Sequence, residues 1–292
     1  RTCLRPMDKP TAAEPPLTIT PPSAPLPDGA CDAHVHLIGD DFALWDGRVE
    51  NPPPGTLDTW LDRYRTHLGL LGCTRGVIVH SILYGGDNSI TLEATRRMGD
   101  QFRAVCLISD NASEAEIAAL AGKGCKALRL NYVHGGLLSW EGMKRLAPIL
   151  ADYGLHVEML AHSHLHLKEL APQVPTLPVQ IVFDHCAWPD PALGMTEGQK
   201  ALERLLADGH CWTKLSATYR HSPEPQTLIQ RLAQANPDRI LWGSDWPHLM
   251  LNGVPMPDAG QQLTTLLDAI PDGTTRQKLF TDNPATLYGF AP

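Results

Sequence analysis

The feature that most constrains this chain is a regular alternation of two hydrophobic patterns from residue 30 onward. Short apolar runs, bounded by Gly, Asp or Asn, alternate with stretches whose apolar residues recur at i, i+3, i+4 and i+7. The short runs predict strands at 30–37, 75–82, 102–109, 125–131, 155–160, 178–184, 211–217 and 238–242. The stretches between and after them predict helices at 57–71, 88–99, 114–121, 140–153, 164–171, 197–208, 225–235 and 259–270.

Eight strand–helix units predict a closed (β/α)8 barrel of the TIM type, folded as a single domain. The chain has 292 residues, which is an ordinary size for such a barrel. A doubly wound sheet is the alternative, but no Gly-x-Gly-x-x-Gly follows the first predicted strand. Ser113 with Glu116, and Thr196 with Gln199, form capping boxes that favour helix starts at these points.

The N-terminal segment differs in composition from the rest of the chain. Residues 1–27 contain eight prolines, few large apolar residues and no hydrophobic periodicity. Such a composition predicts an extended or disordered tail rather than part of a packed core. We therefore divide the chain into a Pro-rich tail over 1–27 and a barrel domain over 28–292.

Charge and cysteine usage narrow the class of partner. Lys plus Arg total 24 against 32 for Asp plus Glu, so the net charge of −8 offers no basic surface for nucleic acid or an anionic membrane. The seven cysteines include no Cys-x-x-Cys pair, and we find neither a signal-peptide pattern nor an apolar run of membrane-spanning length. We expect a reduced, cytoplasmic protein with a small-molecule partner. The sequence leaves a homo-oligomer open.

Polar residues gather where the predicted strands end. His34 and His36 are one residue apart on the first strand and should share a face, since side chains alternate with period two. His185 directly follows the sixth strand, and Asp245 follows the eighth. The carboxyl ends of barrel strands meet at one mouth. Three histidines and an aspartate there would suit a site that polarises a carbonyl and activates water, with or without a metal.

Four motifs in order carry a family resemblance. They are Asp-Ala-His-Val-His at 32–36, Asp-His at 184–185, Trp-Gly-Ser-Asp-Trp-Pro-His at 242–248 and Asp-Asn-Pro-Ala-Thr-Leu-Tyr-Gly-Phe at 282–290. Over residues 28–290 the chain resembles the amidohydrolase superfamily, and within it the lactone-processing branch of the 2-pyrone-4,6-dicarboxylate lactonases. The resemblance implies that His34, His36 and His185 polarise a lactone carbonyl. It also implies that Asp245 takes a proton from the attacking water and later delivers it to the leaving oxygen.

The resemblance carries over to substrate binding only in part. Arg129 and Arg220 fall where that branch holds substrate carboxylates, whereas two further arginine positions are occupied here by Gly135 and Trp188. Each missing arginine removes a bidentate contact, so we expect a lactone with one acidic group, or a sugar-acid lactone. The candidate substrate-binding residues are Arg129, Arg220, Tyr219, Ser81, Glu158, His80, Trp188 and His248. Glu158 could instead pair structurally with Arg129.

The residues at the strand ends also bear on which metal centre the site could hold. Arg129 stands where binuclear relatives place a bridging ligand, and a guanidinium cannot serve as one, so a binuclear centre is not expected. The resemblance favours a site without a cofactor. The alternative is one divalent metal, zinc, held by His34, His36, His185 and Asp245.

Three other functions remain open from the sequence. A lactone isomerase would use a substrate hydroxyl as the nucleophile with the same four residues. A metal-dependent decarboxylase of the same superfamily usually has Glu-x-His-x-His in its first strand, and Asp32 stands in the place of that glutamate here. A non-catalytic barrel could act as a binding or assembly protein.

Overall fold

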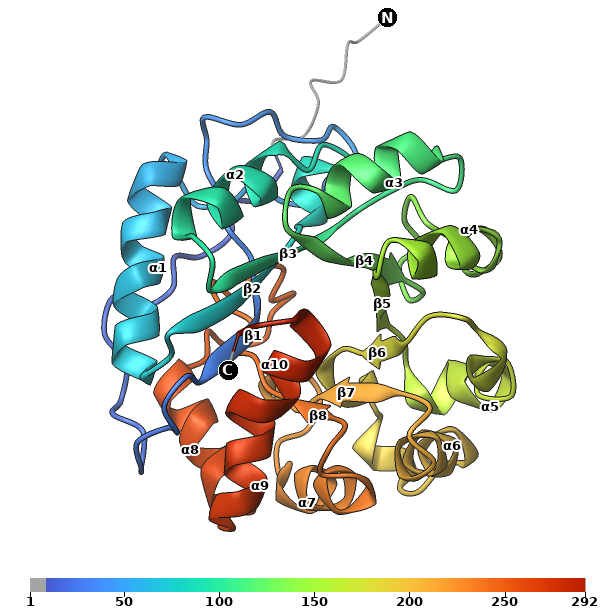
Figure 1. Ribbon diagram of the computed structural model, residues 1–292. Helices are drawn as coiled ribbons and strands as arrows, with labels where there is room; N and C mark the ends of the chain where they lie inside the picture. The colour runs from blue at the N-terminus through green and yellow to red at the C-terminus, as the bar shows by residue number, and fades with distance from the viewer. Residues whose placement is uncertain (1–8, 292) are drawn as a thin grey trace, which may run out of the picture.

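Eight parallel strands follow the sequence order around a barrel. The computed structural model describes residues 9–291, and each strand in it pairs with the next one along the chain (Figure 1). Backbone hydrogen bonds from Ala33 N to Trp242 O and from Asp245 N to His34 O join the last strand segment to the first. The strands are β1 (Cys31–Val35), β2 (Arg75–Val79), β3 (Phe102–Cys106), β4 (Cys125–Asn131), β5 (His156–Leu160), β6 (Ile181–Phe183), β7 (Trp212–Lys214) and β8 (Ile240–Leu241).

Helices surround this barrel, as Figure 1 shows, and the predicted (β/α)8 fold is confirmed. Ser113 and Thr196 cap their helices by accepting from the backbone N–H of Glu116 and Gln199, as their capping boxes predict. The helices are α1 (Leu57–Leu71), α2 (Ser89–Met98), α3 (Glu114–Ala121), α4 (Trp140–Asp152), α5 (Lys168–Leu170), α6 (Glu197–Ala207), α7 (Gln226–Ala235) and α8 (Ala259–Ala269). The helix predicted at 164–171 is a π-helical turn, Ser163–Leu167, followed by the short α5.

Two helices beyond α8 were not predicted. They are α9 (Gly273–Gln277) and α10 (Asn283–Tyr288), with a π-helical turn at Lys278–Asp282 between them. Tyr288 is fully buried, and it packs with Phe290 against Val77, Val105 and Val182 inside the barrel. Arg103, at the start of β3, donates to the Tyr288 carbonyl. The C-terminal segment therefore closes the end of the barrel at which the strands begin.

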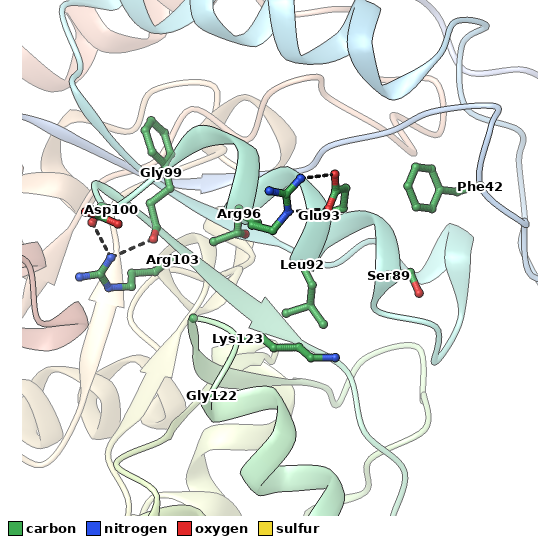
Figure 2. A pocket seen from close by; sticks show the side chains of 13 residues that line it. Phe42, Ser89, Leu92, Glu93, Arg96, Gly99, Asp100, Arg103, Gly122 and Lys123 are labelled. Atoms are coloured by element: carbon green, nitrogen blue, oxygen red, sulfur yellow. Dashed lines mark hydrogen bonds and ion pairs between the residues drawn. The ribbon is translucent and has the colours of Figure 1, made fainter.

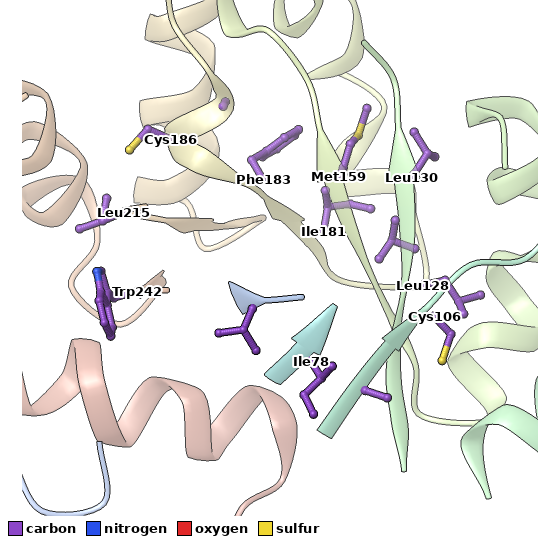
Figure 3. Packing of buried hydrophobic residues seen from close by; sticks show 14 of the residues in the cluster. Ile78, Cys106, Leu128, Leu130, Met159, Ile181, Phe183, Cys186, Leu215 and Trp242 are labelled. Carbon is purple, nitrogen blue, oxygen red and sulfur yellow. The ribbon is translucent and has the colours of Figure 1, made fainter. Parts of the chain in front are cut away.

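The other hydrophobic layer lies between the strands and the helices. Leu128 and Leu130 of β4, and Ile181 and Phe183 of β6, alternate along their strands and are buried in this layer (Figure 3). Burial on both faces explains why β6 is a continuous apolar run in the sequence, whereas β4 has half-buried polar residues at Lys126, Arg129 and Asn131.

The N-terminal segment is extended and lies against the barrel. Of the predicted tail, residues 9–27, which we call the N-terminal strap, are described here, and residues 1–8 lie outside the described part. Ile19 and Leu26 pack against the core, and Thr11 forms a parallel β-bridge with Asn51. Thr20 donates from N and Oγ1 to Asp258, the residue that caps α8. The expectation of an extended conformation holds for this strap, whereas that of disorder does not.

Two further observations bear on the sequence predictions. Across residues 9–291, no helix is both long enough and apolar enough to cross a membrane. Six cysteines are buried free thiols, and the seventh, Cys3, lies outside the described residues.

Candidate active site

Four of the predicted catalytic side chains meet at the mouth of the barrel. The Nε2 atoms of three histidines lie around one oxygen of Asp245, Oδ1: His34 at 3.8 Å, His36 at 3.6 Å and His185 at 3.9 Å. All four residues are buried. The structure therefore brings together the ends of β1, β6 and β8, as the motif positions predict.

Local backbone irregularities aim these side chains. The β1–β2 ladder shifts register between Asp32 and Val35, where a β-bulge lets consecutive residues change faces. His185 and Asp245 both have positive φ, at 55° and 62°, which is a costly conformation for residues other than glycine. Asp245 is held there by the backbone bond from its N to His34 O.

The two oxygens of Asp245 have different environments. Oδ2 accepts hydrogen bonds from Tyr219 Oη at 2.7 Å and from Arg220 Nε at 2.9 Å, whereas Oδ1 faces the three imidazoles. Burial opposes ionisation of this carboxyl, but the Arg220 guanidinium and the neighbouring histidines together outweigh it and hold the pKa of Asp245 well below its usual range. Asp245 is therefore an ionised carboxylate with one oxygen available as a base.

Arg220, Tyr219 and His248 support Asp245. The remaining Arg220 nitrogens donate to the backbone carbonyls of Leu249, at 2.7 Å, and Met250, at 3.0 Å. The Tyr219 hydroxyl also lies 3.1 Å from His248 Nδ1. From the sequence, these three residues were predicted to bind the substrate, whereas in the structure each contacts groups of the protein around Asp245.

The three histidines differ in the partner of their second ring nitrogen. His36 Nδ1 lies 2.7 Å from the Val79 carbonyl, which can only accept, so this nitrogen carries the proton. His185 Nδ1 contacts Ser216 Oγ at 2.8 Å, and burial lowers the pKa of His185 to about 4. His34 Nδ1 faces Lys214 Nζ at 3.1 Å.

A charged cluster that the sequence analysis missed lies inside the barrel behind His34. Lys214 Nζ is 2.5 Å from Glu158 Oε2 and 3.3 Å from Asp184 Oδ1, and all three residues are fully buried. Burial tends to raise the pKa of Glu158, but the Lys214 ammonium and His156 together outweigh it and bring the pKa to about 2. A lysine within the predicted strand 211–217 was the available signal, because lysine is almost never fully buried without a partner.

Glu158 was predicted either to bind the substrate or to pair with Arg129, and its contacts in this cluster show neither. Its carboxylate contacts Lys214, His156 and the Tyr288 hydroxyl, and it does not line the cavity at the barrel mouth. The carboxylate nearest Arg129 among the ion pairs is Asp184, at 3.9 Å from its Nε. Glu158 is thus placed neither against the substrate space nor as the partner of Arg129.

A cavity of about 410 Å³ opens at the barrel mouth, where three of the four catalytic candidates line it, and His34 lies fully buried next to them. Of the predicted site residues, it is lined by His36, His185, Asp245, Arg129, Arg220 and Trp188. Ser81 and His80 lie outside this lining: Ser81 caps the short helix Ile82–Tyr84, and His80 bonds Thr91 Oγ1 and the Gly85 carbonyl.

Most of the cavity wall is apolar, but two arginines, Arg129 and Arg48, also line it. Trp45, Leu137 and Leu160 are among its apolar residues. Arg129 Nη1 makes one long hydrogen bond, 3.5 Å, to the His80 carbonyl, and its buried Nε has no hydrogen-bond partner within the described residues. Arg48, which was not predicted, reaches the same cavity from the loop between β1 and α1. An anionic group entering here would meet unsatisfied donors of Arg129.

The donor atoms at the mouth fit a single metal ion. One ligand atom from each of His34, His36 and Asp245 lies within 4.8 Å of the others, and buried His34 Nε2 lacks a hydrogen-bond partner within residues 9–291. Imidazole nitrogens with a carboxylate are a donor set that suits zinc. A second set, His34, Glu158 and Asp184, already surrounds the Lys214 ammonium.

The structure places Asp32 away from both sets. It accepts from Ser244 N at 2.8 Å and from Ser244 Oγ at 2.5 Å, and it lies 3.5 Å from His67 Nε2 on α1. Asp32 is therefore turned toward the helix layer. Asp32 was the residue that matched the first-strand glutamate of the decarboxylases, and it does not face the site.

A second, larger cavity of about 820 Å³ lies outside the barrel mouth, against α2 and the start of β3 (Figure 2). Two arginines in its wall hydrogen-bond groups of the protein: Arg96 donates to Glu93, and Arg103 donates to the backbone carbonyl of Asp100. It is lined by none of the four catalytic candidates.

Comparison with known proteins shows the family to which the chain belongs. The sequence profile of the family described as amidohydrolase matches residues 31–290. The chain is 30% identical over 278 residues to 4-sulfomuconolactone hydrolase of Hydrogenophaga intermedia, covering 90% of each chain. It is 30% identical to 2-pyrone-4,6-dicarboxylate hydrolase of Comamonas testosteroni, covering 91% of this chain and 92% of that protein.

Two further likenesses extend the comparison. D-galactarolactone isomerase of Agrobacterium fabrum is 26% identical, with 94% of this chain and 96% of that protein covered. An apo crystal structure of an Agrobacterium tumefaciens protein superposes with a TM-score of 0.81 at 24% identity, over 93% of this chain and 99% of that chain. That structure shares the fold.

Proposed function

The chain belongs to the amidohydrolase family, and from this premise we propose that it is a lactone hydrolase that opens the ring of an acidic lactone with water. The observation that carries the proposal is the convergence of three imidazole Nε2 atoms on the free Oδ1 of an ionised Asp245. A carboxylate held this way can remove a proton from water, and a neighbouring N–H can stabilise the oxygen that becomes negative.

In the proposed reaction, a water molecule in the cavity gives a proton to Asp245 Oδ1 as its oxygen attacks the lactone carbonyl carbon. Negative charge develops on the carbonyl oxygen, and an Nε2–H of His185 or His34 stabilises it, since His36 carries its proton on Nδ1. The ring C–O bond then breaks, and the alkoxide that leaves takes the proton from Asp245. The product is a hydroxy acid, and the carboxylate is restored.

Tyr219 and Arg220 act through Asp245 in this scheme. By binding Oδ2, they fix the carboxylate so that Oδ1 points at the cavity, and they keep it ionised. Such a fixed base needs little reorganisation during proton transfer.

Arg129 binds the acidic group of the substrate in this proposal. Its guanidinium lines the cavity and has uncommitted donors, whereas the donors of Arg220 are already engaged. One available arginine on this side, beside a largely apolar wall, suits a lactone with a single acidic group. Gly135 and Trp188 stand where the lactonases have two further arginines, and this also favours a substrate with a single acidic group.

The site also fits one divalent cation on His34, His36 and Asp245, with His185 beside them. Such an ion, when bound, would supply Lewis-acid polarisation of the carbonyl. The protein's own contribution is the same in either case: Asp245 moves the proton and Arg129 orients the acid.

A second candidate is lactone isomerisation, favoured by the similarity to D-galactarolactone isomerase. Here Asp245 Oδ1 would take the proton of a substrate hydroxyl instead of water, and that hydroxyl would close a new ring. No acid would be released.

The cytoplasmic location and the homo-oligomer considered from the sequence remain proposals. Six buried free thiols are what a reducing compartment favours. Size-exclusion chromatography with light scattering would give the oligomeric state.

The test is a panel of monoacidic, diacidic and sugar-acid lactones, assayed with a pH indicator in the presence and absence of a chelator. We expect one equivalent of acid per ring opened, with the monoacidic lactones turned over best. Product NMR that shows a moved ring without acid release would replace hydrolysis by isomerisation. A folded protein that turns over none of the panel, with zinc or without it, would contradict both.

A further inference from the structure

Lys214 is a buried lysine directly behind a proposed catalytic histidine. It lies on β7 and is fully buried. Its ammonium has three neighbours that can accept: Glu158 Oε2 at 2.5 Å, His34 Nδ1 at 3.1 Å and Asp184 Oδ1 at 3.3 Å. The contacts with Glu158 and His34 are hydrogen bonds, and that with Asp184 is an ion pair. An ammonium has three N–H groups and no acceptor, so it can only donate to these neighbours.

The charge of Lys214 is maintained by its surroundings. Burial tends to lower the pKa of a lysine, but Asp184 and Glu158 outweigh it, and the pKa of Lys214 is raised. Because the ammonium can only donate, His34 Nδ1 must accept from it.

This contact determines where His34 carries its proton. Because Nδ1 accepts from the Lys214 ammonium, it cannot itself carry a proton, so the ring is neutral. A neutral imidazole has one N–H, and when Nδ1 accepts, the proton is on Nε2. His34 Nε2 is the atom that faces Asp245 Oδ1. His36 has the opposite arrangement, because its Nδ1 donates to the Val79 carbonyl.

His34 Nδ1 has a second neighbour that competes with Lys214. Asp184 Oδ1 lies 3.5 Å from it and, as an acceptor, would hold the proton on Nδ1 instead. The two neighbours therefore favour opposite tautomers of His34. Lys214 makes the shorter contact, and its three short contacts leave Asp184 partly neutralised.

We propose that Lys214 is a positioning residue that fixes His34 as the Nε2–H tautomer, so that His34 presents a hydrogen-bond donor to the carbonyl oxygen of the substrate. This role rests on the proposed lactone hydrolysis, but the tautomer itself does not. A ring with a proton on Nε2 cannot use that nitrogen as a metal ligand. Lys214 therefore also weakens metal binding at His34. Without Lys214, the His34 proton would move to Nδ1, and Asp184 would accept a hydrogen bond from it.

The first experiment reads the tautomers without any substrate. In histidine-¹⁵N-labelled protein, long-range ¹H–¹⁵N correlation spectra distinguish protonated from unprotonated ring nitrogens, and His34→Gln and His36→Gln variants assign the signals. We expect protonated Nε2 for His34 and protonated Nδ1 for His36. A proton on His34 Nδ1 in the native protein overturns the proposal, whether or not the protein hydrolyses lactones.

The second experiment removes the lysine. Lys214→Met is combined with Glu158→Gln, so that one positive and one negative charge disappear together, and Glu158→Gln alone is the matched control. In the double variant we expect the His34 proton to move to Nδ1 while the His36 signals stay unchanged. We expect kcat to fall about 10²–10³-fold with KM little changed, as for loss of an oxyanion donor. Calorimetric titration should show tighter zinc binding than in the control.

The outcomes separate positioning from mere packing. A folded double variant whose His34 tautomer matches the control would overturn the proposal, even if its activity fell. If the double variant does not fold, as circular dichroism would show, the native spectrum alone decides. Loss of lactonase activity in every protein, with the expected tautomers present, would contradict the proposed function and not the role of Lys214.

Discussion

The two oxygens of Asp245 have separate tasks. Tyr219 and Arg220 hold Oδ2, and the histidines surround Oδ1 at 3.6–3.9 Å, beyond direct hydrogen-bond length. That spacing leaves room for a water oxygen, a carbonyl oxygen or a cation to be shared among them. The reactivity of the site therefore depends on one carboxylate oxygen and on the protons of its imidazole neighbours.

Asp245→Asn tests the base directly. The amide keeps an oxygen to accept from Tyr219 and Arg220 but cannot take a proton, so we expect kcat to fall about 10²–10⁴-fold. Initial rates with the best lactone of the panel measure this, and thermal melts check folding. The exposed Asp208→Asn serves as the control. Activity within tenfold of the native enzyme would rule out Asp245 as the base.

Arg129→Met tests recognition of the acidic group. A lost charge-assisted hydrogen bond is worth about 1.5–3 kcal/mol, so we expect kcat/KM for an acidic lactone to fall roughly 10–100-fold. A neutral lactone with the same ring should be turned over nearly unchanged. The exposed Arg145→Met is the control. An equal loss for acidic and neutral lactones would show that Arg129 acts on the fold or the chemistry instead.

At the level of elements, the N-terminal strap and the loop between β1 and α1 are joined at Asn51. Asn51 N donates to Pro10 O at 2.7 Å, and Ala12 N donates to Asn51 O at 2.8 Å. The Asn51 side chain accepts from Arg48 Nε at 2.9 Å, and Arg48 lines the cavity. The strap therefore holds part of the cavity wall in place through Asn51 and Arg48.

Deleting residues 1–12 should loosen this loop. We expect KM to rise severalfold with a smaller change in kcat, because Asp245 and the histidines do not contact the strap. Faster proteolysis within 40–56 would report the loosening. Deletion of residues 1–8 is the matched control, since it keeps Pro10 and Ala12. Identical KM values for the two truncations would contradict a role for the strap in substrate binding.

For the whole molecule, the uncharged buried histidines link stability to pH. Burial lowers the pKa of His80 to about 4 and that of His248 to about 3. The unfolded chain binds these protons near pH 6.5, whereas the folded protein does not. Their contribution is present above pH 6.5 and is lost as pH falls toward the folded values.

We therefore expect the free energy of unfolding to decline between pH 6.5 and 4, by up to about 3 kcal/mol per histidine. Urea titrations across this range measure it. His80→Gln should flatten the slope, because glutamine does not titrate, whereas the exposed His210→Gln should not. Unfolding free energies that stay constant from pH 6.5 to 4 would contradict this account.

The alternation of short apolar runs and amphipathic stretches determined the barrel from the sequence alone. Local periodicity fixes where strands end, and strand ends in a parallel barrel share one face, so His34, His36, His185 and Asp245 could be placed together. Helix α10 was not predicted, because its six residues are too few to show a helical periodicity. Its position depends on the tertiary packing that buries Tyr288 inside the barrel.

Only the tertiary structure decided which buried charges are partners. Glu158 pairs with Lys214 and not with Arg129, although Arg129 and Glu158 are directly paired in the β4–β5 ladder. Although they are paired in the ladder, the Arg129 side chain lines the cavity at the mouth and that of Glu158 reaches Lys214. The contact of Lys214 with His34 likewise joins β7 to β1 across the barrel interior. Such contacts depend on distances through the barrel interior, which no local pattern encodes. The sequence thus determined where the reactive groups meet, and the packing inside the barrel determined which proton each of them holds.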